Sequence, residues 1–231
     1  MILNRLLRKR RINLKYAIGE VTLIFIGITL SLTFDQWNQN SSWKIKEQEL
    51  LLLLTESVKN DIADLEFKIK ESANTLAYTD FLIKKLTSNS DFSDSISMAF
   101  SMMGYNPQFS PDKLGYNNIL AEGLPIIYDK GRRSDIMQYY QRVDDNISWG
   151  QGVQKHIDEY ISGRIITDFE DYNFASKGVP FDFDKLKSDR IFLNIIKNLK
   201  RLNTVSLERL ESQKNHAEQF LKRLTGDDKA R

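Results

Sequence analysis

Cysteine is absent from all 231 residues of the sequence. Disulfide bonds, thiolate nucleophiles and cysteine-ligated zinc or iron–sulfur sites are therefore excluded. Histidine is nearly absent as well, since only His156 and His216 are available as imidazole ligands or as acid–base groups near neutral pH. The chain has only 4 prolines and 11 glycines. Because these residues interrupt helices, their scarcity favours long helices.

Sequence motifs for catalysis or nucleotide binding are also missing. The chain contains no GxGxxG, P-loop, GxSxG or kinase-type motif, and neither histidine belongs to HExxH. The two histidines are 60 positions apart on separate predicted helices, so we interpret them as satisfied or solvated side chains rather than as a metal site. An enzyme would require an unrecognised carboxylate site. We therefore predict a non-enzymatic protein without cofactor or metal.

Two denser groups of residues remain to be interpreted. The acidic group lacks the spacing of a calcium loop, so we expect solvated or helix-capping roles; it comprises Asp168, Glu170, Asp171, Asp182, Asp184 and Asp189. The aromatic group either lines a pocket for an apolar or sugar ligand or forms part of the core; it comprises Tyr139, Tyr140, Trp149, Tyr160, Phe169, Tyr172 and Phe174. Its helical spacing favours the core.

Charge is distributed unevenly along the chain. Residues 1–15 hold six basic residues and no acidic one, whereas the chain from Gln36 onward holds 27 basic and 29 acidic residues. Binding to nucleic-acid phosphates requires a concentrated basic face, which a nearly neutral body does not supply. We therefore expect no nucleic-acid partner.

The segment from Tyr16 to Phe34 is apolar, and its only charged residue is Glu20. As a helix it is ~28 Å long, close to the ~30 Å hydrocarbon thickness of a bilayer. We predict a transmembrane helix at 16–35 in the inner membrane of a bacterium. Because basic flanks stay inside, we expect residues 1–15 in the cytoplasm and residues 36–225 in the periplasm. The expected interfacial anchors are Arg10, Arg11, Lys15, Tyr16, Trp37 and Trp43.

Two other interpretations of this segment are less consistent with it. A cleaved signal peptide needs small residues before its cleavage site, and Leu32–Asp35 does not provide them. A buried helix of a soluble protein would have a shorter apolar run and no one-sided basic flank.

Polar and small residues form two stripes on the predicted transmembrane helix. Glu20, Gly27 and Ser31 share one face, and the opposite face carries Thr22, Thr29 and Thr33. Either stripe is a candidate helix–helix interface, although such residues are also simply tolerated in membrane helices. Glu20 is costly in hydrocarbon. One interpretation is that Glu20 pairs locally with Lys15 or Arg11. The other is that it contacts a partner subunit, either for assembly or to make the complex sensitive to protons or ions.

The remaining chain has the 3- and 4-residue apolar spacing of helices. We expect long helices near 51–86, 134–169 and 192–225, with Gly226 as a stop and a flexible tail at 226–231. The inner face of the middle helix comprises Ile136, Met137, Tyr140, Val143, Ile147, Ile157, Ile161 and Ile165. The predicted fold is all-α: one N-terminal transmembrane helix followed by an elongated helical bundle with two or three long helices.

Shorter features complete this prediction. Helices are expected at Phe92–Met103 and at Asp112–Ala121, the second capped by Ser110 with Pro111 at its first position. Loops are expected at 123–131 and 177–186, which contain Gly and Pro. Leu50–Leu54 is apolar all round and predicts contacts on more than one side. The first long helix either continues from the membrane segment or breaks near Asn38–Ser42.

The N-terminal third contains a pattern that resembles a known family. The stretch YAIGEVTLIFIGITLSLTFDQWNQ, with its Gly19–Glu20 pair, Gly27 and Trp37, resembles the opening of a family of small Bacteroidota membrane proteins. A second, looser patch comprises Tyr116, Leu120, Gly123, Ile127, Ile136, Tyr139 and Tyr140. The resemblance implies one membrane helix followed by a mostly helical extracytoplasmic domain, and it implies no activity. This sequence departs from the pattern by having several Thr and Ser residues in the membrane helix.

These observations lead to two functional hypotheses. The first is a membrane-anchored helical interaction or scaffold protein, in contact with the lipid bilayer and either self-associating as a homo-oligomer or part of a membrane complex. The second is an extracytoplasmic ligand sensor. A sensor would need a partner subunit for its output, because the 15-residue cytoplasmic segment is too short to supply one.

Overall fold

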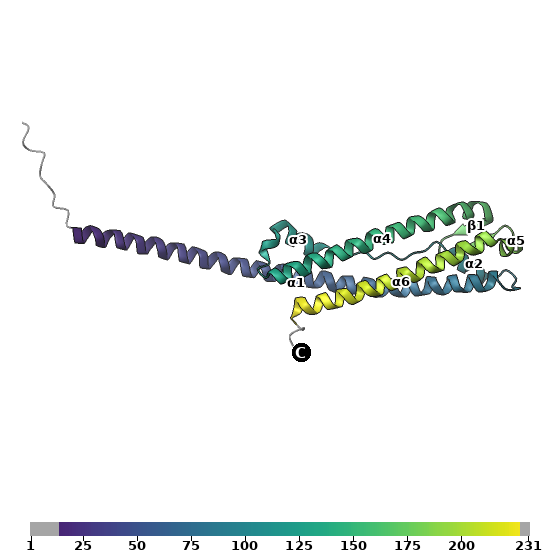
Figure 1. The fold of residues 1–231 in the computed structure, drawn as a ribbon, viewed down its shortest axis with the longest axis horizontal. Coiled ribbons are helices and arrows are strands. Elements are labelled where there is room, and N and C mark those ends of the chain that lie inside the picture. Colours follow the sequence, from purple (N-terminus) through teal and green to yellow (C-terminus); the bar gives the residue numbers. More distant parts are fainter. Residues whose placement is uncertain (1–13, 227–231) are drawn as a thin grey trace, which may run out of the picture. The chain divides into compact units, whose positions relative to one another are not determined.

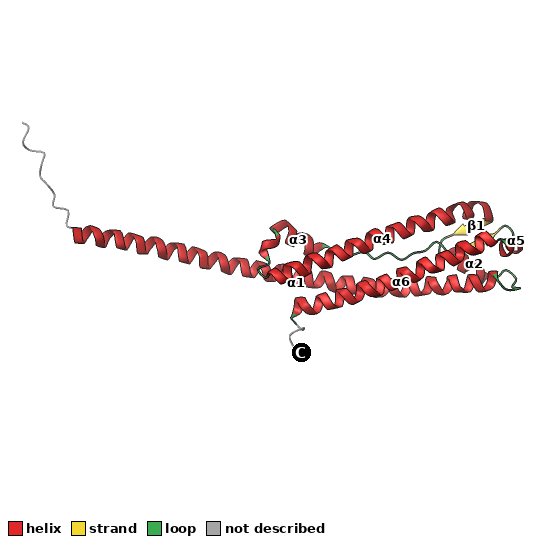
Figure 2. Cartoon of the chain, viewed as in Figure 1, coloured by secondary structure: helices red, strands yellow, loops and turns green. Residues whose placement is uncertain are grey.

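The computed structural model describes residues 14–226, without the side chains of 14–17, 35 and 40. The chain divides into unit 1, residues 1–49, and unit 2, residues 50–231. The elements are α1 (Leu14–Leu86), α2 (Asp94–Ser101), α3 (Leu114–Glu122), a 3-10 turn η1 (Leu124–Ile126), α4 (Lys130–Asp168), β1 (Phe169–Asn173), β2 (Lys177–Pro180), α5 (Phe183–Ser188) and α6 (Arg190–Thr225). The predicted all-α class is confirmed, since the described residues contain one two-stranded sheet among helices (Figure 2).

Unit 1 contributes the N-terminal part of α1. The helix is continuous through Asn38–Ser42, where a break was one of two alternatives. Its threonines do not interrupt it, because their hydroxyls donate to backbone carbonyls of the same helix. Thr22 donates to the carbonyl of Ile18 and Thr29 to that of Phe25, each at 2.8 Å.

Unit 2 is built on three long helices, namely α1 from Leu50 onward, α4 and α6 (Figure 1). Contacts between α1 and α6 pair Glu66 with Lys214 and Asp80 with Lys200, so these two helices run in opposite directions. α4 also packs against α6 in the opposite direction. The chain therefore passes along the bundle in α1, returns, passes again in α4 and returns in α6.

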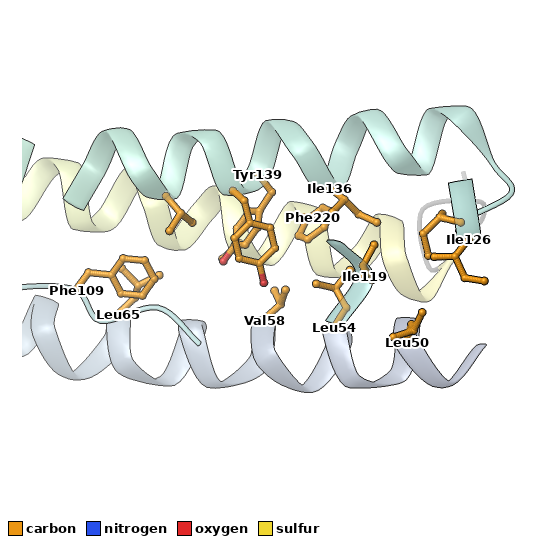
Figure 3. Packing of buried hydrophobic residues seen from close by; sticks show 14 of the residues in the cluster. Leu50, Leu54, Val58, Leu65, Phe109, Ile119, Ile126, Ile136, Tyr139 and Phe220 are labelled. Atoms are coloured by element: carbon orange, nitrogen blue, oxygen red, sulfur yellow. The ribbon is translucent and has the colours of Figure 1, made fainter. Parts of the chain in front are cut away.

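The core of unit 2 consists of two apolar clusters, one at each end of the long helices. We call these ends the Leu50 end and the Leu86 end, after the residues of α1 that lie there. At the Leu50 end, side chains of α1, α4 and α6 meet those of the segment 109–127 (Figure 3). Fully buried side chains there include Leu54, Val58, Leu65, Ile119 and Ile136, and those at the Leu86 end include Leu82, Phe100, Ile196 and Leu199. Burying each such side chain stabilises the fold by about 1.5–3 kcal/mol.

A layer of buried polar residues separates the two clusters. Ser72 and Thr75 lie between them on α1, and Asn203 and Ser206 lie between them on α6. Thr75 donates to the carbonyl of Glu71 at 3.0 Å, whereas the side-chain polar atoms of Asn203 and Ser206 have no hydrogen-bond partner among the described residues. Sliding one helix past the other by a turn would place these groups against leucines. The layer therefore favours one register of α6 against α1.

The segment 104–113 connects α2 to α3 and returns the chain from the Leu86 end to the Leu50 end. The prediction that Ser110 caps this helix and that Pro111 is its first residue is wrong, because α3 begins only at Leu114. The N–H groups of Ser110 and Asp112 donate instead to carboxylates on α1, at 2.9 and 2.7 Å. Asp112 in turn accepts from the Leu114 N–H at 2.9 Å, so the helix starts after this attachment.

The expected loop at 177–186 contains a strand and a short helix, β2 and α5. β2 pairs with β1 in antiparallel fashion, with Tyr172 opposite Gly178. A Cβ at Gly178 would lie 2.7 Å from the Cβ of Phe100, so the glycine lets β2 pack directly on α2. The alternating pattern that marks a strand is missing because a glycine occupies this buried position. The third predicted helix accordingly ends at Asp168, one residue early.

Leu50, Leu51, Leu53 and Leu54 are buried or partly buried, whereas two other residues expected to make contacts on the long helices are exposed. Leu52 is 68 % exposed, because it lies on the face of α1 directed away from its neighbours in unit 2. Met137 is 50 % exposed, since it lies about 100° around α4 from the buried Ile136. The predicted stop at Gly226 is confirmed, as this residue caps α6 in the left-handed conformation with φ 81°. Residues 227–231 of the predicted tail lie outside the described residues.

Candidate functional site

The N-terminal part of α1 carries apolar side chains that no other described residue covers. Val21, Leu23 and Phe25 are 66, 73 and 70 % exposed. The other exposed large apolar residues there are Ile18, Ile24, Ile26, Ile28, Leu30, Leu32 and Phe34. Because these positions are nearly consecutive, they face all directions around the helix, unlike the single stripe of an amphipathic helix.

The predicted assembly residues all lie on this exposed part of α1. Glu20, Gly27 and Ser31 are exposed, and a Cβ at Gly27 would meet nothing within 4 Å. The structure thus leaves this face open without showing what covers it. The predicted pairing of Glu20 with Lys15 or Arg11 involves side chains outside the described part of the chain.

The threonines on the opposite face of the helix do not need a second helix for their hydrogen bonds. The hydroxyl of Thr33 donates to the carbonyl of Leu30 at 2.9 Å, and those of Thr22 and Thr29 also donate within the helix. Their donors are therefore satisfied without a second helix, which is how threonine is accommodated in hydrocarbon.

Of the predicted interfacial anchors, the structure describes the two tryptophans. Trp37 and Trp43 are exposed, at 66 and 57 %, and the ring of Trp37 lies 6.0 Å from that of Phe34. The side chains of Lys15 and Tyr16 are not described. Arg10 and Arg11 lie outside the described residues altogether.

The two histidines are not brought together. His156 lies with its Nδ1 3.3 Å from a carboxylate oxygen of Glu159 on the same helix, whereas His216 on α6 contacts the guanidinium of Arg142 on α4. Within residues 14–226, no group of three or more His, Asp or Glu side chains is placed to hold a metal ion.

The acidic group has the capping role expected for two of its members. Asp182 accepts from the N–H of Lys185 at the start of α5, at 2.9 Å. Asp189 accepts from the first N–H groups of α6, at 2.8 and 3.1 Å. Asp189 and Asp168 also both form ion pairs with Arg164. These ion pairs lie where α4 ends and α6 begins.

The aromatic group is divided between core and surface. Tyr139, Tyr140 and Phe169 are buried, and the ring of Tyr139 stacks on Phe220 with 4.5 Å between centroids. Tyr160 and Phe174 are exposed. Trp149 and Tyr172 are partly buried. These residues therefore do not gather around one cavity for an apolar or sugar ligand.

A buried carboxyl group forms a polar centre that sequence analysis missed. Asp61 on α1 accepts from the N–H of Asp112 at 2.7 Å and from the hydroxyl of Tyr139 at 2.6 Å. Burial raises the pKa of Asp61 to about 6, although both hydrogen bonds act to lower it. Hydrogen bonds from Asn60 and from the N–H of Leu114 hold the pKa of the neighbouring Asp112 below its usual value.

Gly115 completes the attachment of α3 to α1 beside this centre. A Cβ at Gly115 would lie 2.5 Å from the Cα of Leu54, which no side chain tolerates. The Gly115 N–H donates to the hydroxyl of Ser57 at 3.1 Å. The sequence does contain one signal for this centre, because Asp61 interrupts an apolar line on α1 that includes Val58 and Leu65. Nothing in the sequence marks Gly115.

One described helix, α1, is long and apolar enough to cross a membrane, and none of the residues in its most apolar stretch is buried. Comparisons with protein families, curated proteins and solved structures find no match. Function is therefore inferred from the residues and their geometry.

Proposed function

We propose that the chain is a single-pass protein of a bacterial inner membrane, with a cytoplasmic N-terminus and a periplasmic helical domain that acts as an interaction or scaffold module. The observation that carries this proposal is the exposure of apolar side chains on all sides of α1 between Ile18 and Phe34. Each of these larger side chains gains about 1.5–3 kcal/mol on leaving water. Hydrocarbon is an environment that covers all sides of such a helix at once.

Charge and aromatic residues support the orientation. Six basic residues lie before the apolar span and none lies within it, which favours a cytoplasmic N-terminus. Trp37 and Trp43 follow the span and are exposed, as expected for rings at a membrane interface.

Topology is tested by labelling single cysteines, which is clean because the natural chain has none. Asn194→Cys, at an exposed position of α6, is expected to react with a membrane-impermeant maleimide in intact spheroplasts. Asn4→Cys is expected to react only after lysis. Labelling of the second but not the first before lysis, or recovery of the protein in the soluble fraction, would refute the proposal.

Self-association through the small-residue face is the specific form of assembly that we propose. Gly27 and Ser31 leave room for a second backbone, and close approach is what stabilises helix pairs in lipid. Gly27→Cys and Ser31→Cys are expected to form disulfide-linked dimers under mild oxidation in membranes. Phe25→Cys, on the apolar flank, is the matched control. Equal cross-linking at all three positions, or none together with a monomeric mass in detergent, would contradict this.

The alternative function is ligand sensing through a partner subunit. The arrangement of the aromatic residues does not favour it, since most of them are core or surface residues. One observation does favour it, which is a basic groove between α4 and α6.

A further inference from the structure

A groove on unit 2 follows the line where α4 meets α6. It consists of two adjoining cavities of about 270 and 280 Å³, which share Arg142 from α4 and His216 from α6. Tyr139 and Phe220, members of the Leu50-end cluster, line the second cavity, so the groove lies in the half of the bundle nearer that end. We call it the α4/α6 groove.

Two of the three arginines that line this groove contact partners other than carboxylates. Arg142 contacts the imidazole of His216, and the guanidinium of Arg209 lies 4.5 Å from the ring of Trp149. Within the part of the chain that the structure describes, neither arginine forms an ion pair. Arg223, at the far end of the groove, is paired with Asp135 at 3.4 Å. Two guanidinium groups and an imidazole thus converge in a groove whose acids, Asp135 and Asp145, form no ion pair with Arg142 or Arg209 among the described residues.

A buried amide provides a second, independent indication of a ligand. Gln213 lines the first cavity and is only 3 % exposed, yet its Nε2 has no hydrogen-bond partner among the described residues. A buried donor without an acceptor is unfavourable. A rotation of the Gln213 side chain toward this cavity would bring its Nε2 to the acceptor oxygens of a ligand bound there.

We propose that the α4/α6 groove binds a phosphate group, with Arg142, Arg209 and His216 as its cationic donors and Gln213 as its buried neutral donor. Guanidinium groups present paired N–H donors that match the oxygens of a phosphate. The phosphate comes either from a free ion or from the headgroup of an anionic phospholipid. The lipid source depends on the membrane anchoring proposed above, whereas the free ion does not.

The titration of His216 is coupled to any anion that binds in this groove. Burial, followed by the charges of Arg142 and Arg223, lowers its pKa below the usual value. A bound anion would oppose this effect and make proton uptake accompany binding. The charged groups that line the two cavities beside His216 are Arg142, Asp135 and Asp145 from α4, and Arg209 and Arg223 from α6. α1 contributes no lining residue.

The test uses full-length protein in detergent micelles, with ¹⁵N-labelled histidine. The chain has only two imidazoles, so His216 reports on the groove and His156 serves as an internal control. Titration with inorganic phosphate at constant ionic strength, against chloride, is expected to shift the His216 resonances saturably and to leave those of His156 unchanged. Sulfate, whose charge is constant near neutral pH, is expected to bind more tightly at about pH 5.5 than at about pH 8.

Matched variants separate binding from general charge. Arg142→Gln is expected to weaken phosphate binding about 10-fold or more, because a charge-assisted hydrogen bond is lost. Arg201→Gln removes an exposed arginine of α6 that lies outside the groove, and this variant is expected to bind phosphate as the natural protein does. Gln213→Met, which keeps volume without the donor, is expected to weaken binding while leaving the ligand-free protein at least as stable. That combination would not result from a purely structural role.

Nanodiscs distinguish the two sources. A shift of His216 in phosphatidylglycerol nanodiscs that is absent in phosphatidylcholine, and lost in Arg142→Gln, would assign the site to a lipid headgroup. A response to inorganic phosphate alone would assign it to a free ion. No saturable shift with phosphate, sulfate or lipid, or equal effects of Arg142→Gln and Arg201→Gln, would overturn the proposal. The micelle experiment stays decisive even if the labelling experiment refutes the membrane topology.

Discussion

Asp61 places a carboxyl group where its charged form is poorly solvated. It is 1 % exposed, and burial raises its pKa to about 6, well above the usual value for an aspartate. The folded protein therefore binds this proton more tightly than the unfolded chain does. The contribution of Asp61 to stability is fully present below the unfolded pKa and is lost as the pH rises through about 6, at a cost of about 3 kcal/mol.

Asp61→Asn is expected to remove this dependence on pH. Relative to the natural protein, the free energy of unfolding of the variant should rise by about 3 kcal/mol between about pH 4 and pH 7. Urea unfolding of the full chain in micelles would measure it, with Trp149 as probe in a Trp37→Phe, Trp43→Phe background. Comparing the two proteins at each pH cancels the opposing titration of His216, whose lowered pKa reduces stability as the pH falls below about 6.5. Parallel curves for the two proteins would show that Asp61 does not titrate here.

Tyr139→Phe tests the same centre from the other side. Removing the hydroxyl takes away a hydrogen bond that lowers the pKa of Asp61, so this pKa is expected to rise further above about 6. The protein should lose about 1–3 kcal/mol of stability at neutral pH, because a buried carboxylate is left with one donor fewer. The pKa would be read from ¹³C carboxyl shifts. An unchanged pKa would contradict the assigned role of the tyrosine.

Gly115 has no room for a side chain, because its neighbour is the backbone of α1. Gly115→Ala is expected to destabilise unit 2 by about 1–3 kcal/mol, because the new Cβ would meet the backbone of Leu54. Gly152→Ala is the matched control, since its Cβ would meet nothing within 4 Å and alanine favours a helix by about 1 kcal/mol. Thermal unfolding followed by circular dichroism compares the two. Equal effects would mean that α3 does not rest on α1 as described.

At the scale of elements, the junction between α4 and α6 depends on Asp189. This residue caps α6 with two backbone hydrogen bonds and also pairs with Arg164 of α4. The guanidinium of Arg164 lies 5.3 Å from the ring of Phe192, so one arginine contacts both the cap and the first buried residue of α6.

Asp189→Ala is expected to cost about 1–2 kcal/mol from the cap alone, and more because Arg164 loses a partner. Asp182→Ala, which removes a cap with one backbone hydrogen bond from the six-residue α5, is expected to cost less. Hydrogen exchange at the first turn of α6 would locate the effect. Faster exchange in Asp182→Ala than in Asp189→Ala would reverse the ranking.

The long helices could be predicted from sequence because their apolar spacing is regular over many turns. The end of α6 was predictable for a separate reason, since Gly226 is a local signal. The start of α3 was not, because the carboxylates that hold Ser110 and Asp112 lie about 50 positions earlier on α1. β2 was hidden by Gly178, whose role depends on its contact with Phe100. Local patterns thus specify elements, and contacts distant in sequence specify where they begin.

The candidate sites also differ in whether a local pattern or a contact distant in sequence forms them. The apolar span of α1 is visible in the sequence as a run of residues. The α4/α6 groove is not, because Arg142 and His216 are 74 positions apart and meet only when α4 packs against α6. His216 was singled out for its residue type, but its neighbour could not be predicted.

At the scale of the whole molecule, Glu20 tests the membrane assignment. Glu20→Gln and Glu20→Ala are each expected to leave insertion and orientation unchanged, because a carboxylate about one turn inside the border can reach water or a basic neighbour. The cysteine labelling described above measures both. Failure of either variant to insert would contradict this expectation, and loss of Gly27→Cys cross-linking in both would assign Glu20 to the helix contact.

The course of the chain through unit 2 determines how this unit responds to mechanical load. The chain enters at Leu50 and leaves at Gly226, and both residues lie at the same end of the bundle, since Leu50, Phe220 and Leu224 belong to one cluster. Tension applied between these two points pulls α1 and α6 apart sideways, one turn after another, rather than sliding them lengthwise. The contact between α1 and α6 separates first at the Leu50 end, while the loops at the Leu86 end carry no force.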